Sequence, residues 1–480
     1  MSITHNIARL YLTALLFCTY SLYAEQQKTP KAQTTFIVYM AADNDLRSFA
    51  ARNIKQMAAV GSSKDLHIAV HLDIRLAGNK KITRRYYIKQ NKILHINAQD
   101  PETQRMDSGQ PETLISCCKW AIESYPAEDY VLIFWNHGTG ILDPVHGRII
   151  NPTELFTYNP TINMLELDRS VSILGHIHNE VHNEADHAQE ILEILEHGQR
   201  FTNQEEIEEI LQTNDPRGIC WDDSNGNFLD NQKLDYALEA IRHTYLHGNK
   251  FSIIGFDACL MAMVEVANLL SKHAHIMVGS QEVELGTGWN YQKVLEPFAY
   301  GALNKRDFAR HIVHVYAETY NKITHDYTQS AVNLDDLSYL EQNVSEVADM
   351  LIKALKLQKN KSVHNAIRAS KNKLLCTHFD EPSYIDLHHL YVNLEQNLKH
   401  FSFTDVKKGK KLIQQLRRTL DHGRAIIRKL VLANVTGKNL SQAQGISIYF
   451  PERRMHSSYP KTLFTQTTSW AQLLHMYLLG

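Results

Sequence analysis

FSIIGFDACLMAMVEVA, residues 251–267, has the pattern of a buried β-strand that leads into a helix. The first six residues are apolar or small without a break, which is typical of a strand covered on both faces. The segment YVLIFWNHGTG, residues 130–140, begins with the same kind of run, as do residues 35–40 and 67–73. Between these runs lie segments whose apolar residues recur with the period of an α-helix. The alternation predicts an α/β fold with a mostly parallel sheet flanked by helices.

Polar residues end two of these strands. His137 and Asp257 come at the carboxyl ends of their runs, and Cys259 follows two residues later. Ligands of open parallel sheets bind outside the carboxyl ends of the strands. We therefore expect these side chains to meet at one edge of the sheet.

Composition and charge fit an ordinary folded protein. The chain has 480 residues, 44% of them hydrophobic, and a formal net charge of −2 from 50 basic and 52 acidic residues. These values exclude a disordered, collagen-like or coiled-coil protein, and they give no reason to expect a nucleic-acid partner.

The N-terminus resembles an export signal. Residues 7–24 contain Arg9, a short apolar run and a small-residue end at Ala24. The run is too short for a spanning helix, so we expect residues 1–24 to be a signal peptide cleaved near Ala24 and residues 25–34 to be a linker. The mature protein is then secreted or periplasmic, without a stable membrane span. An uncleaved N-terminal anchor is the alternative.

Five cysteines remain after that cleavage. They show no CxxC or zinc-finger spacing, and their number is odd, so at least one thiol stays free or pairs between molecules. They are Cys117, Cys118, Cys220, Cys259 and Cys376.

An acidic, histidine-rich insert interrupts the alternation between residues 144 and 216. No strong strand is predicted there, and residues 176–212 hold ten acidic residues against the single Arg200, with five histidines. We expect an exposed element with a helix near residues 185–197. His178 and His182 have the spacing of two metal ligands on a helix, but a solvated surface is favoured; protonation of the histidines offers a third, pH-dependent role.

The insert divides residues 35–296, the predicted catalytic domain, and residues 297–480 form a mixed, helix-rich C-terminal region. We expect long helices at 305–323, 335–357 and 405–432. Asp222, Asp223 and Asp230 predict a polar turn before a helix and do not fit a twelve-residue calcium loop.

Common hydrolase motifs such as GxSxG, HExxH and the P-loop are absent. What remains is a possible Cys259–His137 dyad, in which a thiolate attacks and an imidazole protonates the leaving group. A helix opening at Cys259 would favour the thiolate, and Gly138 lets its backbone approach a substrate carbonyl. The alternative is a buried structural cysteine and a histidine in a turn.

The sequence around these residues resembles the clostripain-like cysteine peptidases, which have a caspase-like fold. Matching segments occur in a shared order from about residue 36 to the C-terminus. They include FIVYMAADNDL (36–46), VLIFWNHGTG (131–140), WDDSNGNFLDNQKLDYAL (221–238), IIGFDACLMAMVEVA (253–267), GSQEVELGTGWNY (279–291), YIDL (384–387) and GISIYFP (445–451).

The resemblance implies a secreted endopeptidase that cuts proteins or peptides after Arg or Lys. Cys259 would be the nucleophile and His137 the general acid/base. Asp257 matches the acidic floor of the family's specificity pocket, although it could instead cap the next helix.

One position departs from the family pattern. Relatives often carry a second Asp between two glycines, where this chain has Thr287. We expect Thr287 and Glu282 to contribute to substrate binding, with Glu282 and Glu284 partly replacing the lost charge.

The resemblance also implies self-cleavage after a basic residue between His137 and Cys259. Candidate sites are Arg148, Arg169, Arg200 and Arg217, with Arg200 favoured. The insert would then shield the cleft until it is cut.

No cofactor is required by the sequence, while calcium is possible by resemblance, and we expect a monomer. Two alternatives remain open. One is a weak or inactive homologue that binds a protein or a metal through its insert or through the basic stretch 353–429. The other is a self-processing protein with little activity on other substrates.

Overall fold

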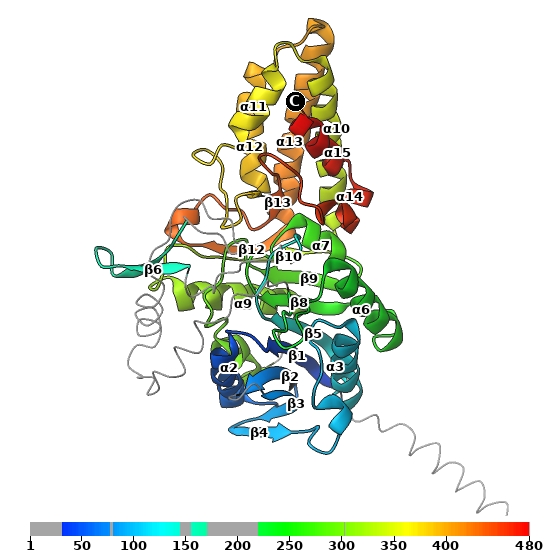
Figure 1. Cartoon of the computed structure of the whole chain (residues 1–480), viewed down its shortest axis with the longest axis vertical. Helices are drawn as coiled ribbons and strands as arrows, with labels where there is room; N and C mark the ends of the chain where they lie inside the picture. The colour runs from blue at the N-terminus through cyan, green and yellow to red at the C-terminus, as the bar shows by residue number, and fades with distance from the viewer. Residues whose placement is uncertain (1–30, 77–79, 145–154, 170–218, 302, 480) are drawn as a thin grey trace, which may run out of the picture.

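The computed structural model describes residues 31–76, 80–144, 155–169, 219–301 and 303–479. These residues build a nine-stranded sheet with helices on both faces and a helical bundle beyond one edge (Figure 1). The predicted α/β fold with a mostly parallel sheet is confirmed.

Five central strands of the sheet run parallel, in the order β9-β8-β5-β1-β2. They are β1 (Ala32–Ala42), β2 (Leu66–Leu76), β5 (Ala127–Trp135), β8 (Phe251–Asp257) and β9 (Ala274–Gly279). All seven residues of β8 are buried, as expected for a strand with helices on both sides.

Antiparallel strands extend the sheet at both ends. They are β3 (Lys80–Lys89) and β4 (Lys92–His95) beyond β2, and β10 (Thr328–Asn333) and β12 (Val431–Thr436) beyond β9. Since β10 and β12 follow residue 297, the C-terminal region supplies two strands of the same sheet. A separate two-stranded sheet pairs β11 (Tyr384–Asp386) with β13 (Ser447–Tyr449).

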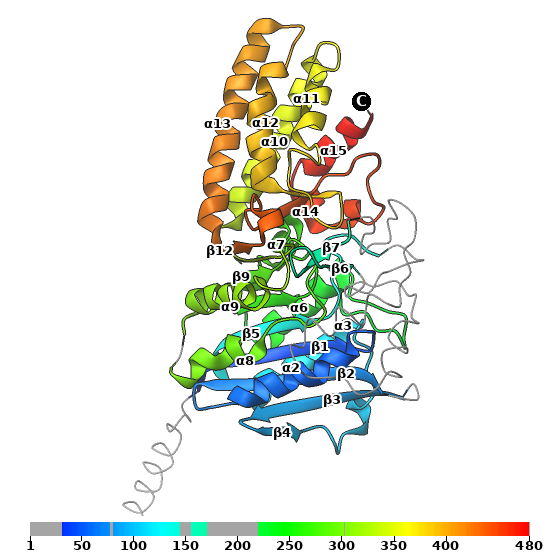
Figure 2. The same ribbon diagram turned by 90° about the vertical axis from the view of Figure 1, so that its left-hand side faces the viewer.

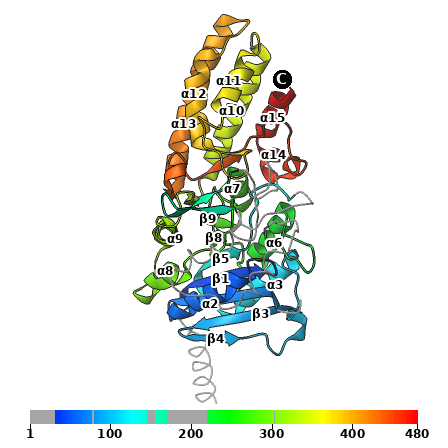
Figure 3. The same ribbon diagram turned by 60° about the vertical axis from the view of Figure 1, so that its left-hand side comes forward.

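Helices cover the two faces of the sheet (Figure 3). One face carries α2 (Arg47–Val60), α8 (Tyr291–Leu295) and α9 (Lys305–Tyr320). The other carries α3 (Pro111–Ser124), α6 (Asn231–Thr244) and α7 (Val264–Leu270). Asp230 accepts a hydrogen bond from the Lys233 backbone N–H and so caps α6, which agrees with the predicted polar turn before a helix.

The remaining helices form a bundle that projects from the β12 side of the sheet (Figure 2). They are α10 (Leu337–Leu357), α11 (Ser362–Ser370), α12 (Leu387–Asn397), α13 (Val406–Leu430), α14 (Leu463–Thr467) and α15 (Trp470–Leu479). The three long helices expected from the sequence correspond to α9, α10 and α13. Among the described residues, no helix has the length and apolar character needed to cross a bilayer.

The start of the predicted insert contains strands that the sequence did not predict. A hairpin of β6 (Phe156–Asn159) and β7 (Met164–Leu167) docks on the body of the protein, where the Leu165 N–H donates to the Ile323 carbonyl at 2.7 Å. Four-residue strands are too short to show a clear period-two pattern. The expected helix near residues 185–197 lies outside the described residues, as do His178 and His182.

A buried cluster of charges fastens the chain that follows the insert. Lys81 Nζ lies 3.0 Å from the Asp73 carboxylate and 3.3 Å from that of Asp43, and it also contacts Asp222. Its side chain is 12% exposed, and the three carboxylates are fully buried. Lys81 therefore joins β2, the loop after β1 and the segment after the insert.

Lys81→Met should destabilise the protein by about 3 kcal/mol, because three buried carboxylates lose their common cation. The free energy of unfolding in urea at pH 7.5 measures this. Lys80→Met, at the exposed neighbouring position, is the control and should change it by less than about 0.5 kcal/mol. Equal effects of the two substitutions would show that the cluster does not hold the segment.

Candidate active site

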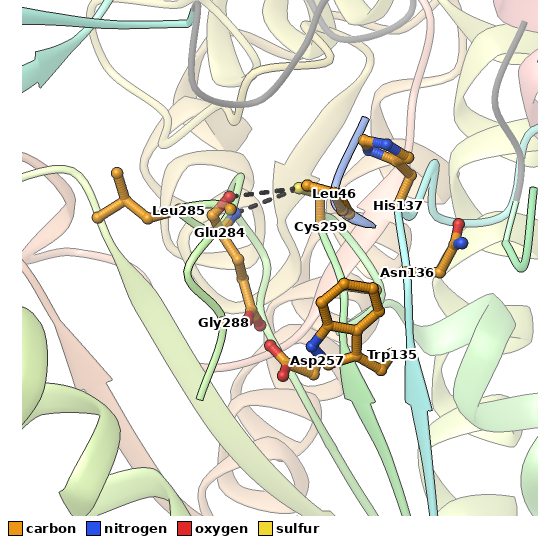
Figure 4. Close-up of a pocket in the computed structure, with 11 residues that line it drawn as sticks. Leu46, Trp135, Asn136, His137, Asp257, Cys259, Glu284, Leu285 and Gly288 are labelled. Atoms are coloured by element: carbon orange, nitrogen blue, oxygen red, sulfur yellow. Dashed lines mark hydrogen bonds between the residues drawn. The ribbon is translucent and has the colours of Figure 1, made fainter. Parts of the chain in front are cut away.

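The carboxyl ends of β5 and β8 bring His137 and Cys259 to one pocket. The two strands pair in parallel, with Trp135 opposite Asp257, so the residues that follow them leave the sheet at the same level. Both side chains line a narrow pocket (Figure 4). The residues that line it are Leu46, Trp135, Asn136, His137, Asp257, Ala258, Cys259, Glu284, Leu285, Gly286 and Gly288.

Gly138 is required by the contact between the two strand ends. A Cβ at this position would lie 2.2 Å from the Cys259 carbonyl oxygen and 3.0 Å from the Cys259 nitrogen. These distances leave no space for a side chain. The backbone of Gly138 therefore lies directly against that of Cys259, as an oxyanion site built from these two residues requires.

Asp45 holds the imidazole of His137. The Asp45 Oδ1 and His137 Nε2 atoms are 2.7 Å apart, and both side chains are buried. A carboxylate in this position fixes the orientation of the ring and stabilises its protonated form. The sequence analysis missed Asp45, although it lies in FIVYMAADNDL directly after β1.

The surroundings of Cys259 differ from the prediction. No helix opens at this residue: the chain turns through Leu260, at a φ of 64°, and α7 begins only at Val264. The prediction that a helix N-terminus at Cys259 favours the thiolate is therefore wrong. Burial raises the pKa of the Cys259 thiol well above its ordinary value, although the Glu284 backbone N–H donates to the sulfur at 3.3 Å.

Asp257 forms part of the pocket floor. Its carboxylate accepts hydrogen bonds from the Trp289 backbone N–H at 3.1 Å and from the Tyr291 hydroxyl at 2.8 Å. Since these partners come from the loop before α8 and from α8 itself, Asp257 does not cap the helix that follows it. Burial raises its pKa to about 6.

Glu282 and Thr287, which the sequence analysis expects to contribute to substrate binding, are not among the residues that line this pocket. Glu282 pairs with Arg169 at 2.8 Å, and the Thr287 hydroxyl hydrogen bonds with that of Tyr320 at 2.8 Å. Glu284, two residues after Glu282, does line the pocket, together with Leu285 and Gly286.

Arg169 is bound by two buried carboxylates. Its guanidinium lies 2.8 Å from Glu282 and 3.2 Å from Asp326, which also accepts the backbone N–H of Leu167. These partners raise the pKa of Arg169 above its ordinary value. Of the four candidate cleavage sites, only Arg169 is described; Arg148, Arg200 and Arg217 lie outside the described residues.

Calcium, which the family resemblance makes possible, would need a group of oxygen ligands. No group of three or more His, Cys, Asp or Glu side chains among them is arranged to hold a metal ion. The densest group of carboxylates, around Asp222, already binds Lys81 and Arg75. We therefore assign no catalytic step to calcium.

The chain matches known peptidases along most of its length. The model of the Clostripain family matches residues 38–151 and 150–477. Clostripain from Hathewaya histolytica is 24% identical over 307 residues, which cover 59% of this chain and 46% of that protein. The chain thus spans less than half the length of this curated relative.

Two solved structures share the fold. A secreted C11 cysteine protease from Bacteroides thetaiotaomicron, bound to an irreversible peptide inhibitor, has a TM-score of 0.54 at 17% identity, with 92% of this chain and 100% of that chain covered. An inactive zymogen C11 protease from Parabacteroides distasonis has a TM-score of 0.53 at 16% identity, with 91% and 98% covered. These similarities confirm the expected caspase-like fold.

The family match includes both strand ends that carry His137 and Cys259. The resemblance noted in the sequence is therefore confirmed: the chain belongs to the clostripain family of cysteine peptidases.

Proposed function

We propose that the protein is a secreted cysteine endopeptidase that hydrolyses peptide bonds after basic residues. One observation carries this proposal: Cys259 and His137 line the same pocket as the buried carboxylate of Asp257. A thiol and an imidazole supply the nucleophile and the proton carrier, and the carboxylate supplies a partner for a cationic side chain.

The reaction starts from a protonated thiol, because burial raises the pKa of Cys259. As the sulfur attacks the substrate carbonyl carbon, its proton passes to His137, which Asp45 orients. The backbone N–H groups of Gly138 and Cys259 stabilise the oxyanion. The imidazolium then protonates the leaving amine. His137 next takes a proton from water, which hydrolyses the thioester and restores the thiol.

Secretion is supported by the export-like residues 7–24 and by the secreted relative from Bacteroides thetaiotaomicron. Self-cleavage within the insert is supported by its basic residues and by the existence of a zymogen in the family. The substrates are then proteins or peptides with exposed Arg or Lys.

Peptides that differ only in Arg, Lys, Asp or Leu before the reporter test the proposal. The chain from residue 25 should cleave the Arg and Lys peptides at least about 100-fold faster than the others, since a buried carboxylate pairs only with a cation. Cys259→Ala should abolish cleavage. Equal cleavage of the Leu peptide would overturn the assigned specificity, and activity that survives Cys259→Ala would overturn the assigned nucleophile.

Asp45→Asn should lower kcat by about 100-fold or more and leave KM nearly unchanged, because the imidazolium loses the carboxylate that orients and stabilises it. Steady-state kinetics with the Arg peptide measures both constants. Glu112→Gln, at an exposed position on α3, is the control and should retain full activity. An unchanged kcat in Asp45→Asn would show that His137 works without this partner.

Arg200→Gln should reduce fragmentation of the chain, whereas Arg169→Gln should not prevent it. The guanidinium of Arg169 is held by Glu282 and Asp326 and is not available to enter the pocket. Gel analysis and N-terminal sequencing of the fragments distinguish the sites, with Cys259→Ala as the uncleaved control. A fragment that begins at Ser170 would contradict the assignment of Arg169, and unchanged processing of Arg200→Gln would remove Arg200 as a required site.

A further inference from the structure

Positive charge gathers in the helical bundle, whereas the rest of the chain is acidic. Residues 353–429, from the last turn of α10 to the last turn of α13, contain 17 basic and 6 acidic residues, a net charge of +11. The whole chain carries −2, so the residues outside this stretch carry −13. A molecule with this distribution turns one end toward an anionic surface and the other end away from it.

Much of this positive charge lies at the far end of the bundle, at the top of Figures 1 and 2. The chain turns twice at this end, between α10 and α11 and between α12 and α13. We call residues 353–363 and 397–411, which contain both turns, the basic tip. The basic tip has nine lysines and a single acidic residue, Asp405. Its exposed lysines include Lys356, Lys359, Lys399, Lys407, Lys410 and Lys411.

Hydrogen bonds between the two turns hold the basic tip in a defined shape. The Lys359 backbone N–H donates to the Ser402 carbonyl at 2.8 Å, and the Thr404 N–H donates to the Leu357 carbonyl at 3.1 Å. Phe403, in the second turn, is buried. The lysines are therefore carried on a packed scaffold.

The placement of four lysines in α13 is unfavourable for the helix itself. Lys407, Lys408, Lys410 and Lys411 lie in its first two turns, where the helix dipole favours acidic residues. Lys407 and Lys411 are four residues apart on one face, and like charges at that spacing repel. Asp405 caps the helix and lies 3.5 Å from Lys408 Nζ, but among the described residues no carboxylate forms an ion pair with the other three lysines. Charges that cost stability without an internal contact are typical of a functional surface.

The apolar side chains near the basic tip favour a lipid surface over a nucleic acid. Residues 353–429 are all described, and the large apolar side chains exposed among them are Leu374, Leu375 and Val406. None is aromatic, so nucleic-acid bases find no ring on which to stack. Val406, 63% exposed at the start of α13, lies beside the lysines, where an aliphatic side chain can enter the headgroup region of a bilayer.

We propose that the basic tip binds the anionic headgroups of a lipid surface and holds the protein there by the end of its bundle. Clusters of about four to eight lysines or arginines bind such surfaces by charge attraction. The contact is peripheral, because the apolar face of α13, with Leu412, Leu416 and Leu420, is buried inside the bundle. No residue that lines the Cys259 pocket belongs to the bundle, so lipid binding leaves the pocket accessible.

Co-sedimentation with vesicles tests the proposal on the chain from residue 25 that carries Cys259→Ala, which prevents self-cleavage. The protein should bind vesicles of equal parts phosphatidylglycerol and phosphatidylcholine at about 0.1 M NaCl and dissociate at about 0.5 M NaCl, because salt screens the attraction. It should not bind vesicles of phosphatidylcholine alone. Soluble glycerol phosphate at the same phosphate concentration should not compete, since only a surface engages many lysines at once.

Glutamine in place of the four lysines of α13 retains a helix-forming side chain and removes four charges. The variant combines Lys407→Gln, Lys408→Gln, Lys410→Gln and Lys411→Gln, and its affinity for the anionic vesicles should fall at least about 100-fold. A matched control removes four exposed charges from the part of the molecule that holds α2, β3 and β4. It combines Lys55→Gln, Lys64→Gln, Lys89→Gln and Lys92→Gln and should bind as tightly as the parent.

Thermal unfolding and duplex DNA separate this role from the alternatives. Relief of the repulsion in α13 should keep or raise the Tm of the α13 variant; a lower Tm together with lost binding would assign these lysines a structural role and overturn the proposal. Equal loss of binding in both variants, or equal binding to neutral and anionic vesicles, would also overturn it. Tighter binding of duplex DNA than of anionic vesicles, at equal phosphate concentration, would assign the basic tip to nucleic acids instead of lipids.

Discussion

The register between β5 and β8 is the constraint on which the site depends. Trp135 lies opposite Asp257, and the strands run parallel, so His137 and Cys259 leave the sheet side by side. Gly138 then packs its backbone against Cys259 at a distance that no Cβ permits. A shift of one residue in either strand would turn every side chain to the opposite face and separate the two groups.

The buried carboxylates along this edge of the sheet differ in whether they contact a lysine or an arginine. Some are neutralised within the chain: Lys81 joins Asp43, Asp73 and Asp222, and Arg169 joins Glu282 and Asp326. These ion pairs fasten segments that flank the insert. Removing one partner of such a pair is costly, because the remaining charge stays in a poorly solvated environment.

Asp257 and Glu284 instead lie next to each other in the pocket, and none of the described residues that line it is a lysine or an arginine. Burial raises the pKa of both carboxyl groups, and the two side chains lie close enough to affect each other's ionisation. Burial also raises the pKa of the Cys259 thiol, which favours its protonated form before substrate binds. Proton transfer to His137 is thus part of the attack and does not precede it.

The sequence alone determined the apolar strands, their alternation with helices and the polar residues at two strand ends. These features follow from local periodicity, so the α/β fold and the pairing of His137 with Cys259 were predictable. The order of motifs along the chain also indicated the family.

Tertiary structure decided which carboxylate performs which task. Asp45 reaches His137 across 92 residues of sequence, Glu282 pairs with Arg169, and Glu284 enters the pocket. The start of α7 at Val264, beyond Cys259, was likewise decided by the turn at Leu260. Local sequence cannot distinguish neighbouring acidic residues, because burial and the nearest cation are set by segments that meet only in the folded chain.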